Sequence, residues 1–429
     1  MADILLNNFL VREILIIMGR TWFLWLPVLS FLVLKELWRR YVRAHFIFSK
    51  KYILLDIKVP REVAKSPKAM ESILAGLHGT RRLGNKIEQW WDGWITAWFS
   101  LEIVGDTSGV HFYIWTQEFF KRVIESQIYA QYPAAEIRVV EDYVKDMPPA
   151  VPDKDWNIWG SELTLTKPDA FPIKTYEEFT LEDISTKEEQ RKIDPLSALI
   201  EWMGVLKGSE KMWVQMLIEP ADDTWKKEGE ALIGKMIGKR TKTKPSFISG
   251  IIGFIDSGIF GFLFGGGTAP APKKSDAPPS QILYLSPGES EVVKSVERNM
   301  AKLGFKVCIR WIYLAKRDEF NMVAVPAVMG IFKQFASQNL NSFGLNKRIT
   351  TSVDYWLVNY RNAWRKNRLF NSYRMRSVFH PPYKTRSKPF VLSTSELATV
   401  YHFPGEVVSA PAMERIEAKR GAPPANLPI

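Results

Sequence analysis

The chain has 429 residues, 46% of them hydrophobic, and carries 58 Lys and Arg against 46 Asp and Glu, a formal net charge of +12. This length and composition allow two or three domains with real cores and exclude a disordered or low-complexity chain. The only cysteine, Cys308, excludes a disulfide framework and fits a reducing compartment.

Residues 1–50 predict a membrane anchor. The run from Thr21 to Leu34 is uncharged, but a spanning helix takes roughly 20 residues, so it would extend from Ile14 to Trp38 with Arg20 snorkelling. The excess of basic residues after the run predicts an uncleaved, single-pass protein of the inner (cytoplasmic) membrane, with the bulk of the chain in the cytoplasm. The alternative is a buried amphipathic helix. Tryptophans suited to the membrane interface are Trp22, Trp25 and Trp38.

A second group of tryptophans follows at Lys86 to Trp94 (KIEQWWDGW). A loop with three indole rings close to an anchor favours contact with the membrane interface, whereas packing in a core explains it about as well. The three candidates for membrane contact are Trp90, Trp91 and Trp94.

Residues 51–150 predict a first domain with ferredoxin-like order. An alternating strand at Tyr52 to Val59 precedes a helix at Ser66 to Leu77, whose apolar residues have helical spacing. A hairpin formed by Trp98 to Val104 and Val110 to Trp115 then precedes an amphipathic helix that stops before Pro133. A last strand, at 137–140, completes the order βαββαβ.

Residues 151–320 predict a second unit of the same order, with an insertion at 221–285. Strands are expected at Glu162 to Thr166, Met212 to Glu219 and Phe305 to Leu314. Helices are expected at Pro195 to Leu206 and at Ser290 to Leu303. A single larger α+β domain is the alternative. The expected fold is therefore α+β, with a transmembrane helix, two ferredoxin-like units and a basic helical or extended C-terminal segment.

The insertion contains an apolar, glycine-rich stretch from Ser246 to Phe264, followed by a linker rich in glycine and proline. Its glycine content argues against a core helix and favours contact with a membrane surface or a partner. An ordinary buried segment is the alternative.

Residues 321–400 contain the most basic part of the chain. From Tyr355 to Ser395 there are nine Lys and Arg, no Asp or Glu, and interleaved aromatic residues. The positive electrostatic field of such a stretch is typical of a site for nucleic acid or anionic lipid. The alternative is a basic face that is merely solvated. The candidate binding residues are Arg361, Arg365, Lys366, Arg368, Arg374 and Arg376.

Residue patterns for catalysis are missing. Neither Gly234-Lys235 nor Gly238-Lys239 has the spacing of a phosphate-binding loop, and the five histidines are too scattered for a metal site. The sequence therefore predicts a non-enzymatic protein without a cofactor or a metal.

The C-terminal residues carry a resemblance to a known family. The motifs are Glu396–Thr399, His402–Gly405 and Pro423–Pro428, together with Trp98–Val104, His111–Ile114 and Glu125–Pro133 upstream. These resemble the amino-terminal region of membrane-anchored ATPases of the type IV secretion and conjugation coupling class, the HerA/FtsK-like group. In that family the C-terminal pattern leads into the ATPase domain.

This sequence departs from that pattern because it ends at Ile429, where the nucleotide-binding domain of the family begins. The resemblance implies a membrane-bound, homo-oligomeric scaffold of a bacterial DNA-transfer machine that docks a separate phosphate-loop ATPase and contacts nucleic acid. The proline-rich tail, 401–429, would suit docking on a partner. A membrane-surface protein that binds anionic lipid without any DNA role is the alternative, and half of a split enzyme is a third.

Overall fold

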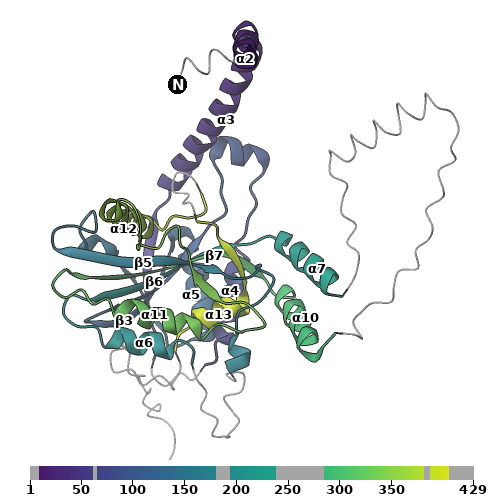
Figure 1. The fold of residues 1–429 in the computed structure, drawn as a ribbon. Helices are drawn as coiled ribbons and strands as arrows, with labels where there is room; N and C mark the ends of the chain where they lie inside the picture. Colours follow the sequence, from purple (N-terminus) through teal and green to yellow (C-terminus); the bar gives the residue numbers. More distant parts are fainter. Residues whose placement is uncertain (1–8, 61–64, 180–193, 238–284, 381–386, 405–429) are drawn as a thin grey trace, which may run out of the picture.

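A computed structural model describes residues 9–60, 65–179, 194–237, 285–380 and 387–404. A single antiparallel sheet crosses the middle of the molecule, with helices on both faces, and a long helix projects away from it (Figure 1). The predicted insertion stretch, 246–264, its linker and the tail after residue 404 lie outside the described residues.

The nine strands form one sheet in the order β4-β1-β3-β2-β6-β7-β5-β8, and β9 pairs with β7 beyond the end of β5. Every pairing is antiparallel. The bounds are β1 Tyr52–Lys58, β2 Phe99–Asp106, β3 Gly109–Gln117, β4 Glu136–Val140, β5 Trp156–Leu165, β6 Lys211–Pro220, β7 Gly304–Lys316, β8 Phe343–Leu345 and β9 Phe390–Ser393.

The expectation of a transmembrane helix followed by two ferredoxin-like units is wrong. The chain is α+β, but its strands make one sheet, because β2 and β6 pair along their length from Phe99 opposite Ile218 to Gly105 opposite Met212. This pairing gives each strand the hydrogen bonds that an open edge would lack. The strand order on the two sides of this junction is mirrored, with β3, β1 and β4 on one side and β7, β5 and β8 on the other.

The predicted anchor is also wrong. Among the described residues, the structure contains no helix with the length and apolar character needed to cross a membrane. The expected continuous helix is broken at Thr21, between α2 (Phe9–Arg20) and α3 (Trp22–Phe48), and charged residues of α3 begin at Lys35. Only thirteen uncharged residues remain between these limits. The single-pass, inner-membrane location expected from the sequence is therefore not supported.

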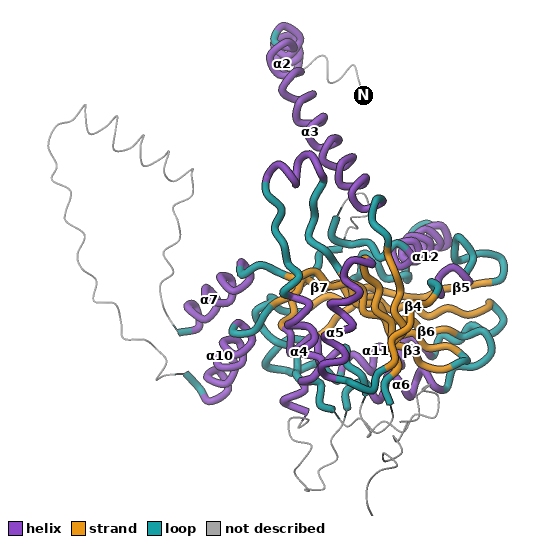
Figure 2. The backbone as a smooth tube through the Cα atoms, turned by 180° about the vertical axis from the view of Figure 1, so that it is seen from behind, coloured by secondary structure: helices purple, strands orange, loops and turns teal. Residues whose placement is uncertain are grey.

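One face of the sheet is covered by helices that enclose the largest apolar core. Leu74 and Leu77 of one helix and Ile124 and Ile128 of another project into this core. Figure 2 shows the layer from behind. Its helices are α4 Lys68–His78, α5 Lys121–Gln131, α6 Ser197–Gly204, α11 Ala324–Lys333 and α13 Thr394–Val400; α7 Thr224–Met236 and α10 Pro287–Met300 form a smaller cluster at one side.

The opposite face is covered by α12 (Val358–Arg374) and by the loop that follows β4. Leu369, Phe370 and Tyr373 are buried against Trp213 and Ile312 of the sheet. Tyr373 lies three and four residues after Phe370 and Leu369, so the three side chains share one side of α12. The other side of the helix remains in solvent.

A row of buried polar residues crosses the sheet under α12. Glu102 of β2 lies opposite Gln215 of β6, which lies opposite Arg310 of β7, which lies opposite Glu162 of β5. We call these four residues the polar row. Arg310 Nε donates to Glu162 at 2.6 Å, and its other nitrogens donate to the carbonyl oxygens of Ser372 and Ser377 at 2.9 and 2.6 Å.

Arg376 completes this network from the end of α12. It is 1% exposed, donates to both carboxylate oxygens of Glu102 at 2.8 and 3.0 Å, and also pairs with Asp142 at 2.7 Å. Burial alone would lower the pKa of Arg376, but Glu102 and Asp142 hold it well above its usual value. The segment after α12 is thus held to the sheet by charge-assisted hydrogen bonds.

We expect Arg376→Ala to destabilise the protein by about 3–5 kcal/mol, because the change leaves Glu102 buried without its cation. Urea unfolding followed by far-UV circular dichroism measures this loss. Arg374→Ala is the matched control: among the described residues its guanidinium donates to the carbonyl of Pro149 alone, so the change should cost about 1 kcal/mol or less. Equal losses in the two variants would contradict a structural role specific to Arg376.

A carboxyl group is also buried at the start of α13. Ser393 and Glu396 form a reciprocal capping box, and Glu396 additionally accepts a hydrogen bond from the backbone of Ile173 at 2.9 Å. Burial raises the pKa of Glu396 to about 7, although these hydrogen bonds oppose the rise. The E-L-A-T motif, which carries part of the family resemblance, therefore serves as a buried helix cap in this fold.

We expect the raised pKa of Glu396 to make stability depend on pH. The folded state holds this proton more tightly than the unfolded state, so its contribution is complete below about pH 4.5 and is lost as the pH rises through about 7. Glu396→Gln, which can still form the capping box, should flatten this dependence by up to about 3 kcal/mol. Unfolding free energies measured from pH 4.5 to 8 would contradict the assignment if both proteins showed the same slope.

Candidate functional site

The exposed side of α12 carries aromatic and basic residues in adjacent lines. Tyr360, Trp364 and Arg368 follow one another at intervals of four, so they share one line along the helix. Arg361 and Arg365 form the neighbouring line. The guanidinium of Arg368 lies over the Trp364 ring, 5.1 Å from its centroid. The buried side chains of α12 thus fix which residues remain for contact with a ligand.

The chain enters α12 through two strained residues. Trp356 and Leu357 have φ values of +39° and +50°, in the left-handed region that bulky residues rarely adopt. Each such residue costs roughly 1–2 kcal/mol. The conformation leaves Trp356 80% exposed, next to exposed Tyr355 and Tyr360. Strain that presents apolar rings to solvent is a feature of binding sites.

A pocket with a volume of about 410 Å³ lies between α12 and residues 348–349. We call it the arginine pocket. None of its four arginines forms an ion pair with a described carboxylate; its one acidic side chain, Glu162, is buried and already bound by Arg310. The pocket therefore has an uncompensated positive charge. Its lining is Glu162, Arg348, Ile349, Arg361, Trp364, Arg365, Arg368, Leu369 and Ser372.

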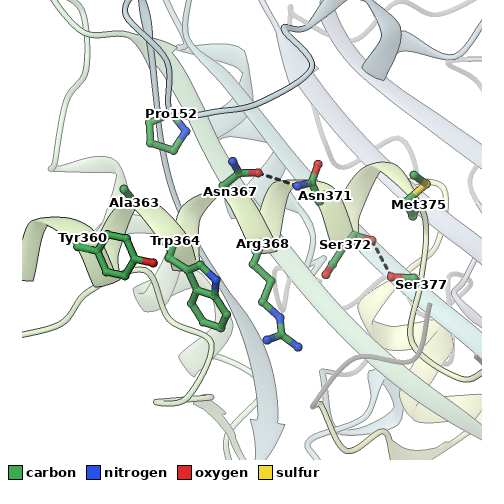
Figure 3. A pocket seen from close by; sticks show the side chains of 10 residues that line it. All are labelled: Pro152, Tyr360, Ala363, Trp364, Asn367, Arg368, Asn371, Ser372, Met375 and Ser377. Carbon is green, nitrogen blue, oxygen red and sulfur yellow. Dashed lines mark hydrogen bonds between the residues drawn. The ribbon is translucent and has the colours of Figure 1, made fainter. Parts of the chain in front are cut away.

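A second, more open hollow of about 670 Å³ follows the same helix (Figure 3). Tyr360, Trp364 and Arg368 lie along one side of it, Pro152 lies across from the helix, and Asn367 and the neighbouring Asn371 form a hydrogen bond. Trp364 and Arg368 also line the arginine pocket, so they form a ridge between the two hollows. An extended ligand lying across this ridge would meet an indole ring and a guanidinium together.

The structure separates the predicted basic residues into two groups. Arg361 and Arg368 line the arginine pocket, and one nitrogen of Arg361 donates to the carbonyls of Tyr355 and Trp356 at 2.9 and 3.5 Å. Arg365 also lines the pocket, but one of its nitrogens donates hydrogen bonds to the backbone carbonyls of residues 347, 350 and 352. Lys366 points away to Asn157 at 2.8 Å, and burial, assisted by a nearby arginine, lowers the pKa of Lys366.

The other two predicted residues are not part of this surface. Arg374 donates to a backbone carbonyl at 2.6 Å, and Arg376 is enclosed by Glu102 and Asp142. Charge density alone could not tell these cations from those that face solvent. The sequence interpretation also missed Arg348, which lies outside the acid-free stretch and reaches the pocket only through the fold.

The tryptophans predicted to contact a membrane lie in three different surroundings. Trp22 and Trp25 lie at the start of α3, away from the sheet, while Trp38 donates to the carbonyl of Trp90 at 2.8 Å and meets the Trp91 ring edge-on at 5.5 Å. The turn η1 (Glu88–Asp92) holds the last two rings. Trp94 is half-buried instead, meets the Phe46 ring edge-on and donates to the carbonyl of Arg82 at 3.3 Å.

The described residues contain no cluster of three or more His, Cys, Asp or Glu that could hold a metal ion. Two of the histidines pair singly with buried acids: His402 with Asp194 at 3.0 Å and His380 with Glu219 at 2.7 Å. Burial raises the pKa of the Cys308 thiol to about 12, which disfavours the thiolate.

Fold and site together define an α+β protein with a basic, aromatic groove over one face of an antiparallel sheet. Residues 49–415 match the family described as Domain of unknown function (DUF8128). Since this match covers most of the chain, the protein belongs to that family. No curated protein matches the chain. The family description names no activity, substrate or partner.

We expect Leu357→Gly to stabilise the protein by up to about 1 kcal/mol, because glycine adopts a positive φ without steric cost and this side chain is exposed. Thermal unfolding would measure the gain. Val358→Gly, at the first position of the helix and without a positive φ to relieve, should instead destabilise by up to roughly 0.5–1 kcal/mol. A loss of stability in both variants would contradict backbone strain at residue 357.

Proposed function

We propose that this protein is a non-enzymatic adaptor that binds a single strand of nucleic acid along α12. The observation that carries the proposal is the arginine pocket, in which guanidinium groups that pair with no described carboxylate lie beside an exposed indole ring. Phosphate groups are recognised by arginine, and unpaired bases stack on aromatic rings. The site combines both elements on one helix.

The arrangement favours a single strand over a duplex. Tyr355, Trp356, Tyr360 and Trp364 offer exposed rings, which an intact duplex can meet only with its backbone or base edges. Bases of a single strand can instead turn toward the rings while the backbone phosphates face Arg348, Arg361 and Arg368. Binding of this kind tolerates many sequences and weakens steeply with salt.

The wider role proposed for this adaptor is in a DNA-transfer machine, where it would dock a separate phosphate-loop ATPase and assemble as a homo-oligomer. This part rests on the resemblance of its motifs to type IV secretion coupling proteins. Co-purification of the full chain from its native cells, followed by mass spectrometry, tests it. A stoichiometric phosphate-loop partner is the expected result, and recovery without one would contradict the docking role.

The nucleic-acid proposal predicts that the triple variant R348A/R361A/R368A binds labelled oligothymidylate at least tenfold more weakly than the unchanged chain. Because about 0.7 counterions are released per phosphate contact on a single strand, the slope of log affinity against log salt should also fall by about 2. Fluorescence anisotropy titrations at several salt concentrations measure both quantities.

The matched control is K207A/K227A/K294A, which removes the same charge from exposed positions on other elements. It should leave the affinity and the salt slope nearly unchanged. If both triple variants lose affinity equally, binding follows net charge alone and the arginine pocket is not the site. Duplex DNA in the same assay should bind more weakly than the single strand.

A further inference from the structure

A second exposed surface lies far from α12, on the first part of α3. From Trp22 to Leu34 the helix has no charged residue, and its large apolar side chains are exposed around the whole circumference. Phe31, for example, is 65% exposed. Monomeric soluble proteins rarely leave an apolar surface of this extent without a partner.

The base of this apolar stretch continues into a groove between α3 and η1. The groove has a volume of about 910 Å³, and six of its lining residues are Phe31, Leu34, Leu37, Trp38, Tyr41 and Trp91. Trp91 is 66% exposed, and its ring meets Trp38 edge-on. Figures 1 and 2 both show η1 and the loop segments on either side of it beside α3.

Positive charge lies within the groove, at Lys35, and continues along the chain toward the sheet. Lys35 is exposed, its ammonium lies 5.1 Å from the centre of the Trp90 ring, and it forms no ion pair with a described carboxylate. Between Lys35 and Lys51 the chain has six basic residues and a single acidic one, Glu36, which pairs with Arg39 and Arg40. The surface is therefore apolar from Trp22 to Leu34, and aromatic and basic residues alternate from Lys35 toward the sheet.

We propose that this α3 groove and the apolar stretch beyond it bind anionic lipid, with acyl chains against Phe31 and Leu34 and the headgroup phosphate near Lys35. Tryptophan and tyrosine prefer the headgroup level at the edge of the acyl chains, and Trp38, Tyr41 and Trp91 lie within two helical turns of Lys35 or against a ring that does. Basic residues on the headgroup side add attraction to an anionic surface.

The dimensions fit contact with one lipid leaflet rather than a crossing. The thirteen uncharged residues of α3 measure about 20 Å along the helix axis, against about 30 Å for the hydrocarbon core of a bilayer. Charge favours lipid over a second copy of this chain as the occupant, because two such surfaces would bring their lysines and arginines together. This inference is independent of nucleic-acid binding at α12.

The test uses the full chain and vesicles of phosphatidylcholine, with or without phosphatidylglycerol, in a flotation assay. Binding should rise with the anionic fraction, and brominated acyl chains should quench the tryptophan fluorescence. F31S/W91S should reduce binding at least tenfold. Lys35→Gln should weaken binding to anionic vesicles about fivefold and leave binding to neutral vesicles unchanged.

The matched control is Trp356→Ser, which removes an even more exposed ring from the α12 surface. It should leave vesicle binding unchanged while weakening oligonucleotide binding, so the two proposals can fail separately. Unaltered flotation of F31S/W91S would overturn the lipid site. So would sedimentation of the lipid-free chain as a dimer that becomes a monomer in F31S/W91S, since a second copy would then cover the groove.

Discussion

The buried pairing of Arg310 and Arg376 with Glu162 and Glu102 is the interaction on which the rest of this face depends. Four strands contribute to the polar row, and it crosses the junction between the two halves of the sheet, where Glu102 of β2 lies opposite Gln215 of β6. Arg310 also donates to the carbonyls of Ser372 and Ser377. Buried charges of this kind are costly unless every partner is present, so they fix the position and register of the end of α12.

This anchoring explains the composition of the exposed site. The cations that face inward are neutralised by carboxylates of the sheet, whereas Arg348, Arg361 and Arg368 have no such partners among the described residues. The apolar residues of α12 follow the same division: Phe370 and Tyr373 fill the core and Trp364 stands in solvent. One basic segment thus supplies both a structural clamp and a charged pocket.

Much of the local structure was readable from sequence. The expected strands at residues 52–59, 98–104, 110–115 and 212–219 are confirmed as β1, β2, β3 and β6, and the helix expected at 290–303 is confirmed as α10, three residues earlier at each end. Alternation, helical spacing and caps depend on neighbours close in the chain. The order of strands and helices along each half could be predicted from such local patterns. The union of all strands into one sheet could not, because pairing between β2 and β6 leaves no local pattern in the sequence.

The sequence by itself determined where positive charge, aromatic rings and apolar runs occur, since these are properties of composition and spacing. Only the tertiary structure decided which charges are free. Arg376 and Arg368 are alike in sequence context, yet the first is neutralised by carboxylates more than 200 positions away and the second faces solvent. The same holds for α3, where the break at Thr21 and the packing of η1 turn an expected membrane span into an exposed groove. Contacts between distant residues set both outcomes, and no local pattern encodes them.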